Sequence, residues 1–138
     1  MTLYAYTDGA SRGNPGESGI GLIVKDETGK EILTLHGYIG QATNNIAEYT
    51  ALLELLKKVK KMECSHLIVH SDSELMVRQI NGLYKVKDHG LKKYFERVGR
   101  LLKNAPFTVE LVHIPRERNL DADRLANMGI DSKKRLRA

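Results

Sequence analysis

The run HLIVHSD, residues 66–72, decides the fold of this chain because of what stands on either side of it. The preceding segment, TNNIAEYTALLELLKKVKKM at 43–62, carries apolar residues at helical spacing. A short apolar run after such a helix is typical of a buried strand that lies parallel to an earlier one. Parallel strands need a crossover connection, which the helix supplies. The sequence therefore predicts an open sheet with helices packed against it.

Further strands and helices are expected on both sides of this unit. Strands are predicted at 3–7, 19–26, 31–40 and 107–114, with a hairpin turn at 26–30. Helices are predicted at 73–82, 91–104 and 119–130, with Ser73 and Asn119 as caps. The expected fold class is α/β, a five-stranded mixed sheet with helices on both faces. We expect one domain over residues 1–130, followed by a basic tail at 131–138.

Composition limits the class of protein to which the chain can belong. Its 138 residues are 41% hydrophobic, which is ordinary for one globular domain. A single cysteine excludes an intramolecular disulfide framework and a cysteine-based zinc site. No leader pattern and no apolar run of about 20 residues is visible, so we expect a cytoplasmic protein without a membrane partner. The net charge of +5 favours a polyanionic partner such as nucleic acid.

Four acidic residues are expected to meet at one edge of the predicted sheet. In the segment YAYTDGASRGNPG, residues 4–16, Asp8 ends the first strand, and Asp72 ends the strand at 66–72. Glu48 lies one turn into the first helix and Asp123 in the first turn of the last one, both on the faces that carry the apolar residues. Taken alone, each acid has an ordinary explanation as a helix cap, a partner of the helix dipole or a turn former. The functional prediction depends on all four lying together.

Carboxylates packed at one edge repel one another, and a hard divalent cation relieves that repulsion. Mg²⁺ prefers oxygen ligands and is the usual ion where phosphates complete its coordination. Two such ions about 4 Å apart can activate a water and stabilise the leaving oxygen of a phosphodiester. The sequence has no serine–histidine–acid or cysteine–histidine pattern that would supply a nucleophile instead.

Four segments of the chain resemble the signature segments of type 1 ribonuclease H, in its short, archaeal-like branch. They are YTDGASRGNPG, ATNNIAEYTALLELL, HSDSELMVRQI and RNLDADRLAN, and they follow one another in order to about residue 130. The resemblance implies a ribonuclease H-like fold and an endonuclease that cuts the RNA strand of RNA–DNA hybrids, leaving 3′-hydroxyl and 5′-phosphate ends. It implies that two Mg²⁺ ions, with Mn²⁺ as a possible substitute, are bound by Asp8, Glu48, Asp72 and Asp123.

The same resemblance implies a set of residues that contact the hybrid. It includes a Gly-Asn turn and a pair of asparagines whose amides suit a minor groove lined by 2′-hydroxyls. The full set is Gly9, Ser11, Arg12, Gly13, Asn14, Asn44, Asn45, Ser73, Arg118 and Asn119. Recognition through shape and sugar makes cleavage largely independent of base sequence.

His113 resembles, by its spacing of ten residues before Asp123, a catalytic histidine found in many members of the family. The alternative is a strand residue with no role in catalysis, and Arg116 or Arg118 would then contact phosphate. Some relatives also carry a long basic handle between the middle helices. Here the segment NGLYKVKDHGLKKYF is short, with Lys85, Lys87, Lys92 and Lys93 as partial substitutes or as solvated surface residues.

Three other functions remain open from the sequence. A nuclease of the same fold can act on another duplex, such as double-stranded RNA or the substrates of resolvases and integrases. A hybrid-binding module without catalysis is the second alternative, although all four acids are present. The third is a domain of a larger polymerase. We expect a monomer.

Overall fold

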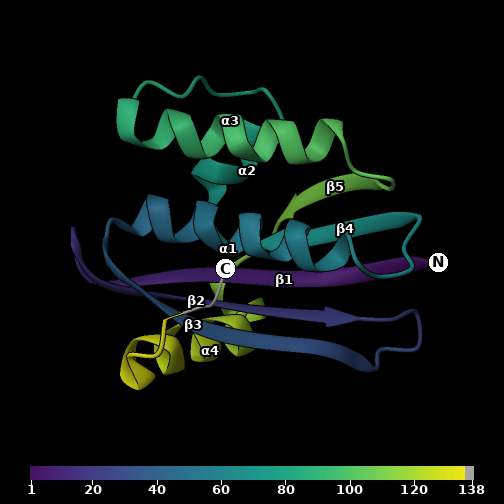
Figure 1. The fold of residues 1–138 in the computed structure, drawn as a ribbon, viewed down its shortest axis with the longest axis horizontal. Helices are drawn as coiled ribbons and strands as arrows, with labels where there is room; N and C mark the ends of the chain where they lie inside the picture. The colour runs from purple at the N-terminus through teal and green to yellow at the C-terminus, as the bar shows by residue number, and fades with distance from the viewer. Residues whose placement is uncertain (136–138) are drawn as a thin grey trace.

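A computed structural model describes residues 1–135 of the chain (Figure 1). Its five strands form one sheet in the order β3-β2-β1-β4-β5. The strands are β1 (Thr2–Gly13), β2 (Gly16–Lys25), β3 (Glu31–Ala42), β4 (His66–Ser71) and β5 (Thr108–His113). The helices are α1 (Asn44–Val59), α2 (Glu74–Ile80), α3 (His89–Lys103) and α4 (Leu120–Ser132), with a short 3₁₀ turn η1 (Arg116–Arg118).

The sheet is mixed, as predicted. β1, β2 and β3 form an antiparallel meander, whereas β4 pairs in parallel with both β1 and β5. The connection from β3 through α1 to β4 returns the chain to the far side of β1. β1 therefore lies at the centre of the sheet, with β4 on one side and β2 on the other.

The predicted end of the first strand is wrong. β1 does not stop at Thr7 but continues to Gly13, and Asp8 pairs with Gly21 inside the β1–β2 ladder. The glycine-rich segment extends the strand because Gly13, at φ 107°, allows a tight hairpin that leads straight into β2. β4 does end where expected, with Ser71 opposite Thr7. Asp8 thus lies on β1 just beyond the last residue that β4 pairs.

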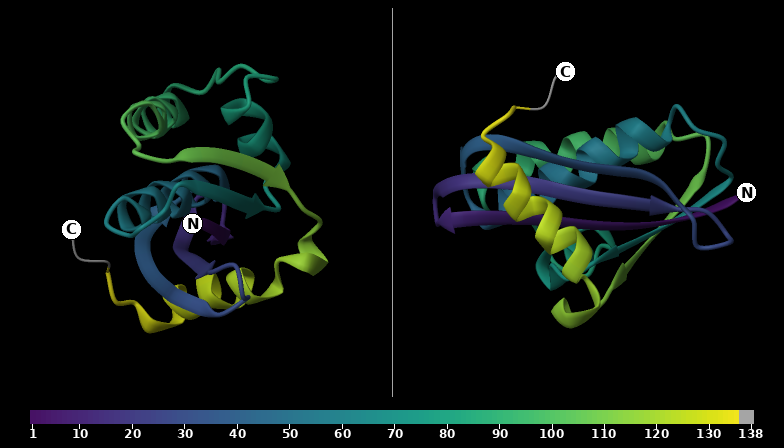
Figure 2. Two further views of the ribbon diagram at one scale, coloured as in Figure 1. Left: turned by 90° about the vertical axis from the view of Figure 1, so that its right-hand side faces the viewer. Right: turned by 90° about the horizontal axis from the view of Figure 1, so that it is seen from below.

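Helices cover both faces of the sheet, which confirms the predicted layers (Figure 2). α1 packs on β1 and β2, with α3 packed on α1, and α4 packs on the other face against β1, β2 and β3. Residues 18–24 of β2 are all buried because they lie between two helices. Gly21 allows the close approach of α4, since a Cβ there would lie 2.5 Å from the carbonyl oxygen of Ala122.

The ends of the helices follow local side-chain chemistry. Thr43 and Ser73 cap α1 and α2 by accepting bonds from backbone N–H groups three residues on. Asp88 does the same for α3, which begins at His89, two residues earlier than predicted. Asn119 precedes α4 as expected, but its side chain makes no capping bond. None of the helices within residues 1–135 is long and apolar enough to span a membrane.

The predicted tail begins inside the fold. α4 continues to Ser132, and Lys133 then adopts a left-handed conformation that turns the chain back toward β3. The Tyr38 N–H donates to the Lys134 carbonyl oxygen at 3.0 Å, and Arg135 lies over the Tyr38 ring. The rest of the predicted tail, residues 136–138, lies outside the described residues.

Candidate active site

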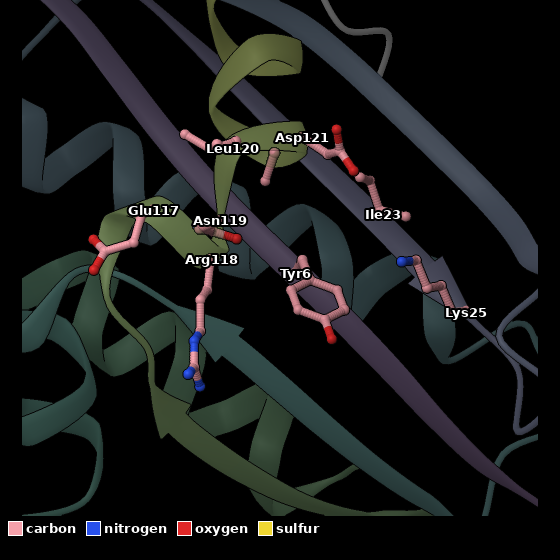
Figure 3. A pocket seen from close by; sticks show the side chains of 9 residues that line it. Tyr6, Ile23, Lys25, Glu117, Arg118, Asn119, Leu120 and Asp121 are labelled. Carbon is pink, nitrogen blue, oxygen red and sulfur yellow. The ribbon is translucent and has the colours of Figure 1, made fainter.

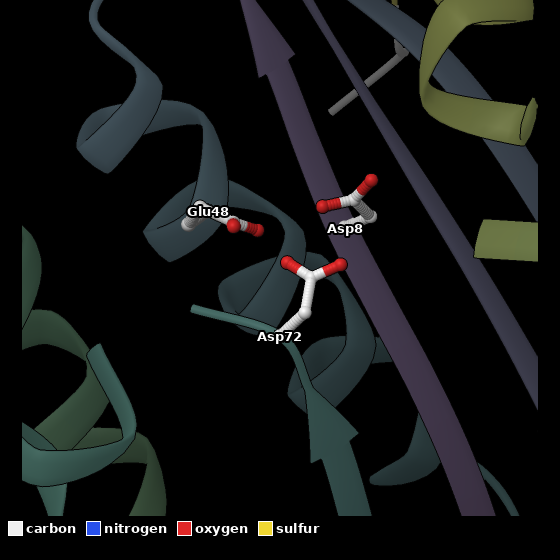
Figure 4. Close-up of side chains that lie close together, drawn as sticks. All are labelled: Asp8, Glu48 and Asp72. Carbon is white, nitrogen blue, oxygen red and sulfur yellow. The ribbon is translucent and has the colours of Figure 1, made fainter. Parts of the chain in front are cut away.

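Three carboxylates meet where β4 ends, as Figure 4 shows. One oxygen from each of Asp8, Glu48 and Asp72 lies within 4.8 Å of the others. Asp8 comes from the part of β1 that β4 leaves unpaired, Asp72 directly follows β4, and Glu48 lies just after the first turn of α1. These three acids therefore meet as predicted. They do so because β4 ends beside the middle of β1, and not because both strands end there.

Glu48 is held by the backbone of β1. The Gly9 N–H donates to Glu48 Oε1 at 2.7 Å. Position 9 also sets how close α1 comes to the strand, because a Cβ there would lie 2.3 Å from the carbonyl carbon of Ala47. Only glycine allows this approach without moving the helix. Gly9, predicted as a substrate contact, thus places a metal-ligand candidate.

Asp72 is held by Asn119, which we predicted as a helix cap and a substrate contact. The Asn119 side-chain NH₂ donates to Asp72 Oδ2 at 3.3 Å and to the Thr7 carbonyl oxygen at 2.9 Å. Because Asn119 is 2% exposed, this amide is a fixed part of the protein interior. The capping prediction is wrong, because the oxygen of this side chain accepts no bond from the N–H groups in the first turn of α4.

Asp123 lies at the rim of the same site. It lines a cavity of about 310 Å³ together with Asp8, Glu48 and Asp72. Its side chain is 27% exposed, and Arg116 Nη2 lies 4.0 Å from its Oδ1. Asp123 does not belong to the group of three carboxylates within 4.8 Å of one another, although its side chain interacts with Asp8 and raises the pKa of that acid.

The electrostatics of the site favour a cation. The pKa of Asp8 is raised from 3.8 to about 8, chiefly by burial, and also by the charge of Asp72 and by the side chain and charge of Asp123. The pKa of Glu48 is raised well above its ordinary value, chiefly by burial and also by repulsion from Asp8 and Asp72. The pKa of Asp72 rises because of burial, although the Asn119 amide and Arg116 oppose that change.

A divalent cation fits this donor set. The group of three presents only carboxylate oxygens, the hard ligands that Mg²⁺ and Mn²⁺ prefer. Asp8 and Glu48 are 5% and 8% exposed and have no basic side chain within ion-pair distance among residues 1–135. A bound cation would supply the missing counter-charge.

The predicted substrate contacts divide into residues at the site and residues tied elsewhere. Ser11 and Asn44 line the carboxylate cavity, and Asn14 Oδ1 accepts a bond from the Asn44 N–H at 3.1 Å. Gly13 and Asn45 are exposed beside them. The site thus has a polar rim made by the β1–β2 hairpin and the start of α1. Their contact with nucleic acid stays a prediction.

Two other predicted contacts have structural partners, and a third lies at another cavity. Arg12 forms an ion pair with Asp131 at 2.6 Å. The Ser73 hydroxyl caps α2, and its N–H donates to Ser71 Oγ. Arg118 does not reach the carboxylate cavity and lines a separate cavity instead. The structure therefore separates Arg118 from the four acids.

His113 is the last residue of β5, opposite Ser71, and its side chain is exposed. It is near enough for its charge to make a small contribution to lowering the pKa of Asp72, after the effects of burial, Asn119 and Arg116. The four predicted lysines, at 85, 87, 92 and 93, are exposed between α2 and α3 and in the first turn of α3. The roles of these residues stay predictions.

Two polar residues at the site were absent from the predicted set. Arg116 lines the carboxylate cavity, and so does Asn127. Arg116 was considered only as a phosphate contact, and no sequence signal tells which arginine of η1 faces the acids. Asn127 follows Asp123 by one helical turn, so the i, i+4 spacing was the signal that could have found it.

Comparisons with known proteins agree with this geometry. Residues 6–129 match the protein family described as reverse transcriptase-like. A Coxiella burnetii protein named ribonuclease H is 34% identical over 145 aligned positions, covering 94% of this chain and 90% of that protein. The chain belongs to the ribonuclease H family.

Solved ribonuclease H structures have the same fold. LC11-RNase H1, in complex with an RNA/DNA hybrid, is 42% identical with a TM-score of 0.89, covering 94% of this chain and 97% of that one. RNase H1 from Halobacterium salinarum is 34% identical with a TM-score of 0.90, covering 96% and 99%. These matches confirm the predicted family and fold class.

Some relatives are longer than this ribonuclease H chain. It spans 64% of the Halobacterium salinarum protein named ribonuclease HI, at 35% identity. It spans 36% of the Mycobacterium tuberculosis protein named bifunctional protein Rv2228c, at 37% identity.

Proposed function

We propose that this chain hydrolyses the RNA strand of RNA–DNA hybrids with two divalent metal ions, leaving 3′-hydroxyl and 5′-phosphate ends. The observation that carries the proposal is the group of Asp8, Glu48 and Asp72 in a member of the ribonuclease H family, with Asp123 at its rim. The RNA/DNA hybrid in the structure of the related LC11-RNase H1 supports the choice of substrate.

In this proposal Asp8, Glu48, Asp72 and Asp123 hold the metal ions, with Mg²⁺ as the first choice and Mn²⁺ as the alternative. When bound, such ions activate a water and stabilise the leaving oxygen of the phosphodiester. The protein itself orients the ligands, through the Gly9 N–H on Glu48 and the Asn119 amide on Asp72. Arg116, exposed beside Asp123, is placed to contact a phosphate of the substrate.

The hybrid is recognised, in this proposal, by the polar rim around the acids. Asn14, Asn44 and Asn45 offer amide groups at the joint between the β1–β2 hairpin and α1. Such groups suit 2′-hydroxyls and sugar edges, which distinguish an RNA strand from a DNA strand. We assign proton transfer or product release to His113, the exposed residue at the end of β5.

Cleavage of matched RNA–DNA, RNA–RNA and DNA–DNA duplexes with Mg²⁺ and with Mn²⁺ tests the proposal. We expect cuts in the RNA strand of the hybrid alone, with 5′-phosphate ends. Cleavage of RNA–RNA at a similar rate would instead assign double-stranded RNA as a substrate. Tight hybrid binding without any cleavage would leave a binding module. The same assay also tests His113. If His113→Ala cleaves at the wild-type rate while Arg116→Ala cleaves slowly, the histidine has no role in the mechanism.

A further inference from the structure

An apolar patch is exposed where α2 leads into α3, on the opposite side of the molecule from α4 (Figure 1). Leu75 of α2 and the neighbours Leu83 and Tyr84 are all exposed large apolar side chains. Leu83, at 66%, has the largest exposed fraction of any large apolar side chain within residues 1–135. Apolar side chains that gather at one exposed place mark a site where another molecule binds.

The three side chains line a hollow and not a projecting surface. Its volume is about 420 Å³, and Lys85 and Lys87 complete its lining. A hollow of this volume accepts side chains of another molecule, whereas a flat lipid surface would leave it unfilled. It shares no lining residue with the carboxylate cavity, so it is a separate site.

The hollow is shaped by backbone hydrogen bonds at the end of α2. The Arg78 carbonyl oxygen accepts the N–H groups of Leu83 and Tyr84, at 2.8 and 3.2 Å. Gly82, at φ 81°, supplies the turn that brings these residues back onto the helix. The helix itself is anchored in the core through Met76, which is buried. The patch is therefore formed before a partner arrives, which lowers the cost of binding.

The rim of the hollow is positively charged. Lys85 and Lys87 are exposed, and neither has a carboxylate within 4.0 Å in the described part of the chain. The acids on either side of this segment have other partners. Glu74 pairs with Arg78 at 3.1 Å, and the Asp88 carboxylate caps α3. The unbalanced charge at the rim thus favours an anionic partner.

The composition of the patch favours a peptide over a strand of nucleic acid. Unpaired strands bind chiefly by stacking bases on aromatic rings. Here one face of the Tyr84 ring is covered by Arg78, whose guanidinium lies 5.5 Å from the ring centroid. The two leucines offer aliphatic surface, which is stabilised by apolar side chains. A peptide that carries both apolar side chains and carboxylates matches the floor and the rim of the hollow.

We propose that this hollow binds an acidic segment of a partner protein. The segment places a large apolar side chain against Leu75 and Leu83, and its carboxylates lie beside Lys85 and Lys87. This interaction goes beyond the proposed nuclease activity, because no residue of the hollow lines the carboxylate cavity. Since α2 begins at Glu74, two residues after Asp72, a partner bound here is held close to the candidate active site.

The first experiment selects random short peptides, displayed on phage, on wild-type protein and on Leu83→Ser. We expect wild type to enrich peptides with leucine or an aromatic residue next to two or more acidic residues, and Leu83→Ser not to enrich them. Because Leu83 is exposed, the variant should keep its fold, which its melting temperature checks. No enrichment on wild type, equal enrichment on both proteins, or enriched peptides without acidic residues would overturn the proposal.

The second experiment measures the affinity of the most enriched peptide by fluorescence anisotropy. Leu83→Ser should weaken binding by about 10-fold, the value of one buried leucine. Lys85→Glu should weaken it by about fivefold, and by less at high salt. The control is Leu120→Ser, the same change at a leucine that is 60% exposed beside a separate cavity (Figure 3). Equal affinities of Leu83→Ser and Leu120→Ser would place the peptide elsewhere and overturn the proposal.

The third experiment separates a peptide from other occupants of the hollow. Asp8→Asn protein with Mg²⁺ should bind the peptide equally well with and without blunt RNA–DNA hybrid or single-stranded oligo(dT). Displacement by either would assign the hollow to nucleic acid. Binding of phosphatidylserine vesicles in place of the peptide would assign it to a membrane surface, and self-association that Leu83→Ser removes would assign it to a second copy. Each of these results would overturn the proposal. Peptide binding needs no cleavage, so failure of the nuclease proposal would appear separately.

Discussion

Glu48 and Asp123 both come from near the start of a helix, yet their surroundings differ. Glu48 is 8% exposed and accepts a bond from the Gly9 N–H at 2.7 Å. Asp123 is 27% exposed, and its nearest basic atom is Arg116 Nη2 at 4.0 Å. Glu48 is fixed by the backbone of the central strand, whereas Asp123 lies at the rim beside the exposed side chain of Arg116.

The difference follows from how each helix meets the sheet. α1 approaches β1 at a glycine, so its first turn touches the strand that carries Asp8. α4 packs against β1, β2 and β3 on the opposite face and reaches the carboxylate cavity with Asp123 in its first turn and Asn127 one turn later. We infer that Glu48 defines the geometry of the metal site and that Asp123 adjusts to what is bound.

The largest expected effect comes from Glu48→Gln, which keeps the shape of the side chain and removes its charge. We expect cleavage of hybrid to fall by more than about 100-fold, because loss of an outer-shell partner already costs up to that much. Glu54→Gln, two turns further along α1 in an ion pair with Lys57, is the matched control and keeps its activity. Steady-state rates with Mg²⁺ measure both. A Glu48→Gln enzyme within tenfold of wild type would remove Glu48 from the metal ligands.

Gly9→Ala is expected to displace the Glu48 side chain while leaving its charge unchanged. The added Cβ would lie 2.3 Å from Ala47 and must displace α1, so we expect a loss of about 1–3 kcal/mol in the free energy of unfolding. A displacement near 1 Å costs about 100-fold in rate.

Gly99→Ala is the control for this change, because no atom lies within 4 Å of its added Cβ in α3. It should stabilise the protein by about 0.5–1 kcal/mol. Chemical denaturation and cleavage rates of the two variants give the comparison. Equal stability of the two variants would contradict the role of the close approach.

Asp123→Asn is expected to have a smaller effect than Glu48→Gln. Because Asp123 stands at the rim, we expect a loss of about 10-fold that higher Mg²⁺ concentrations partly restore. Asp121→Asn, on the exposed side of the same turn, is the control. Cleavage rates of both variants, measured over a range of Mg²⁺ concentrations, test this expectation. A loss as large as that of Glu48→Gln, without recovery, would show that the two acids are equivalent.

The smallest expected effect is on the stability of the metal-free protein. The pKa of Asp8 is raised from 3.8 to about 8, chiefly by burial, so the folded state keeps a proton that the unfolded state loses. Stability therefore falls as pH rises from about 4 to about 8. We expect the melting temperature to drop by about 5 °C or more over that range. Mg²⁺ should offset the drop, and Asp8→Asn should flatten it. A flat wild-type profile without metal would contradict the burial of these charges.

Periodicity and strand ends were sufficient to predict the sheet, its layers and the meeting of three acids. The extension of β1 beyond Asp8 was missed because a glycine-rich segment usually indicates a loop. Here the segment continues the strand, and Gly13 forms the hairpin turn into β2. The use of Asn119 was missed because an asparagine before a helix usually caps it. Whether Arg116 or Arg118 faces the acids depends on a single turn of 3₁₀ helix, and no periodicity determines that direction.

The chain after α4 has a consequence for how this protein behaves at high concentration. β3 is one of the two outer strands of the sheet, and an uncovered outer strand offers its N–H and C=O groups to a strand of another molecule. Here the Tyr38 N–H is already bonded to Lys134, and the Arg135 guanidinium lies within 3 Å of where a Cβ on Gly40 would stand. Charged residues of the same chain thus occupy this part of the edge and protect the sheet from self-association through β3.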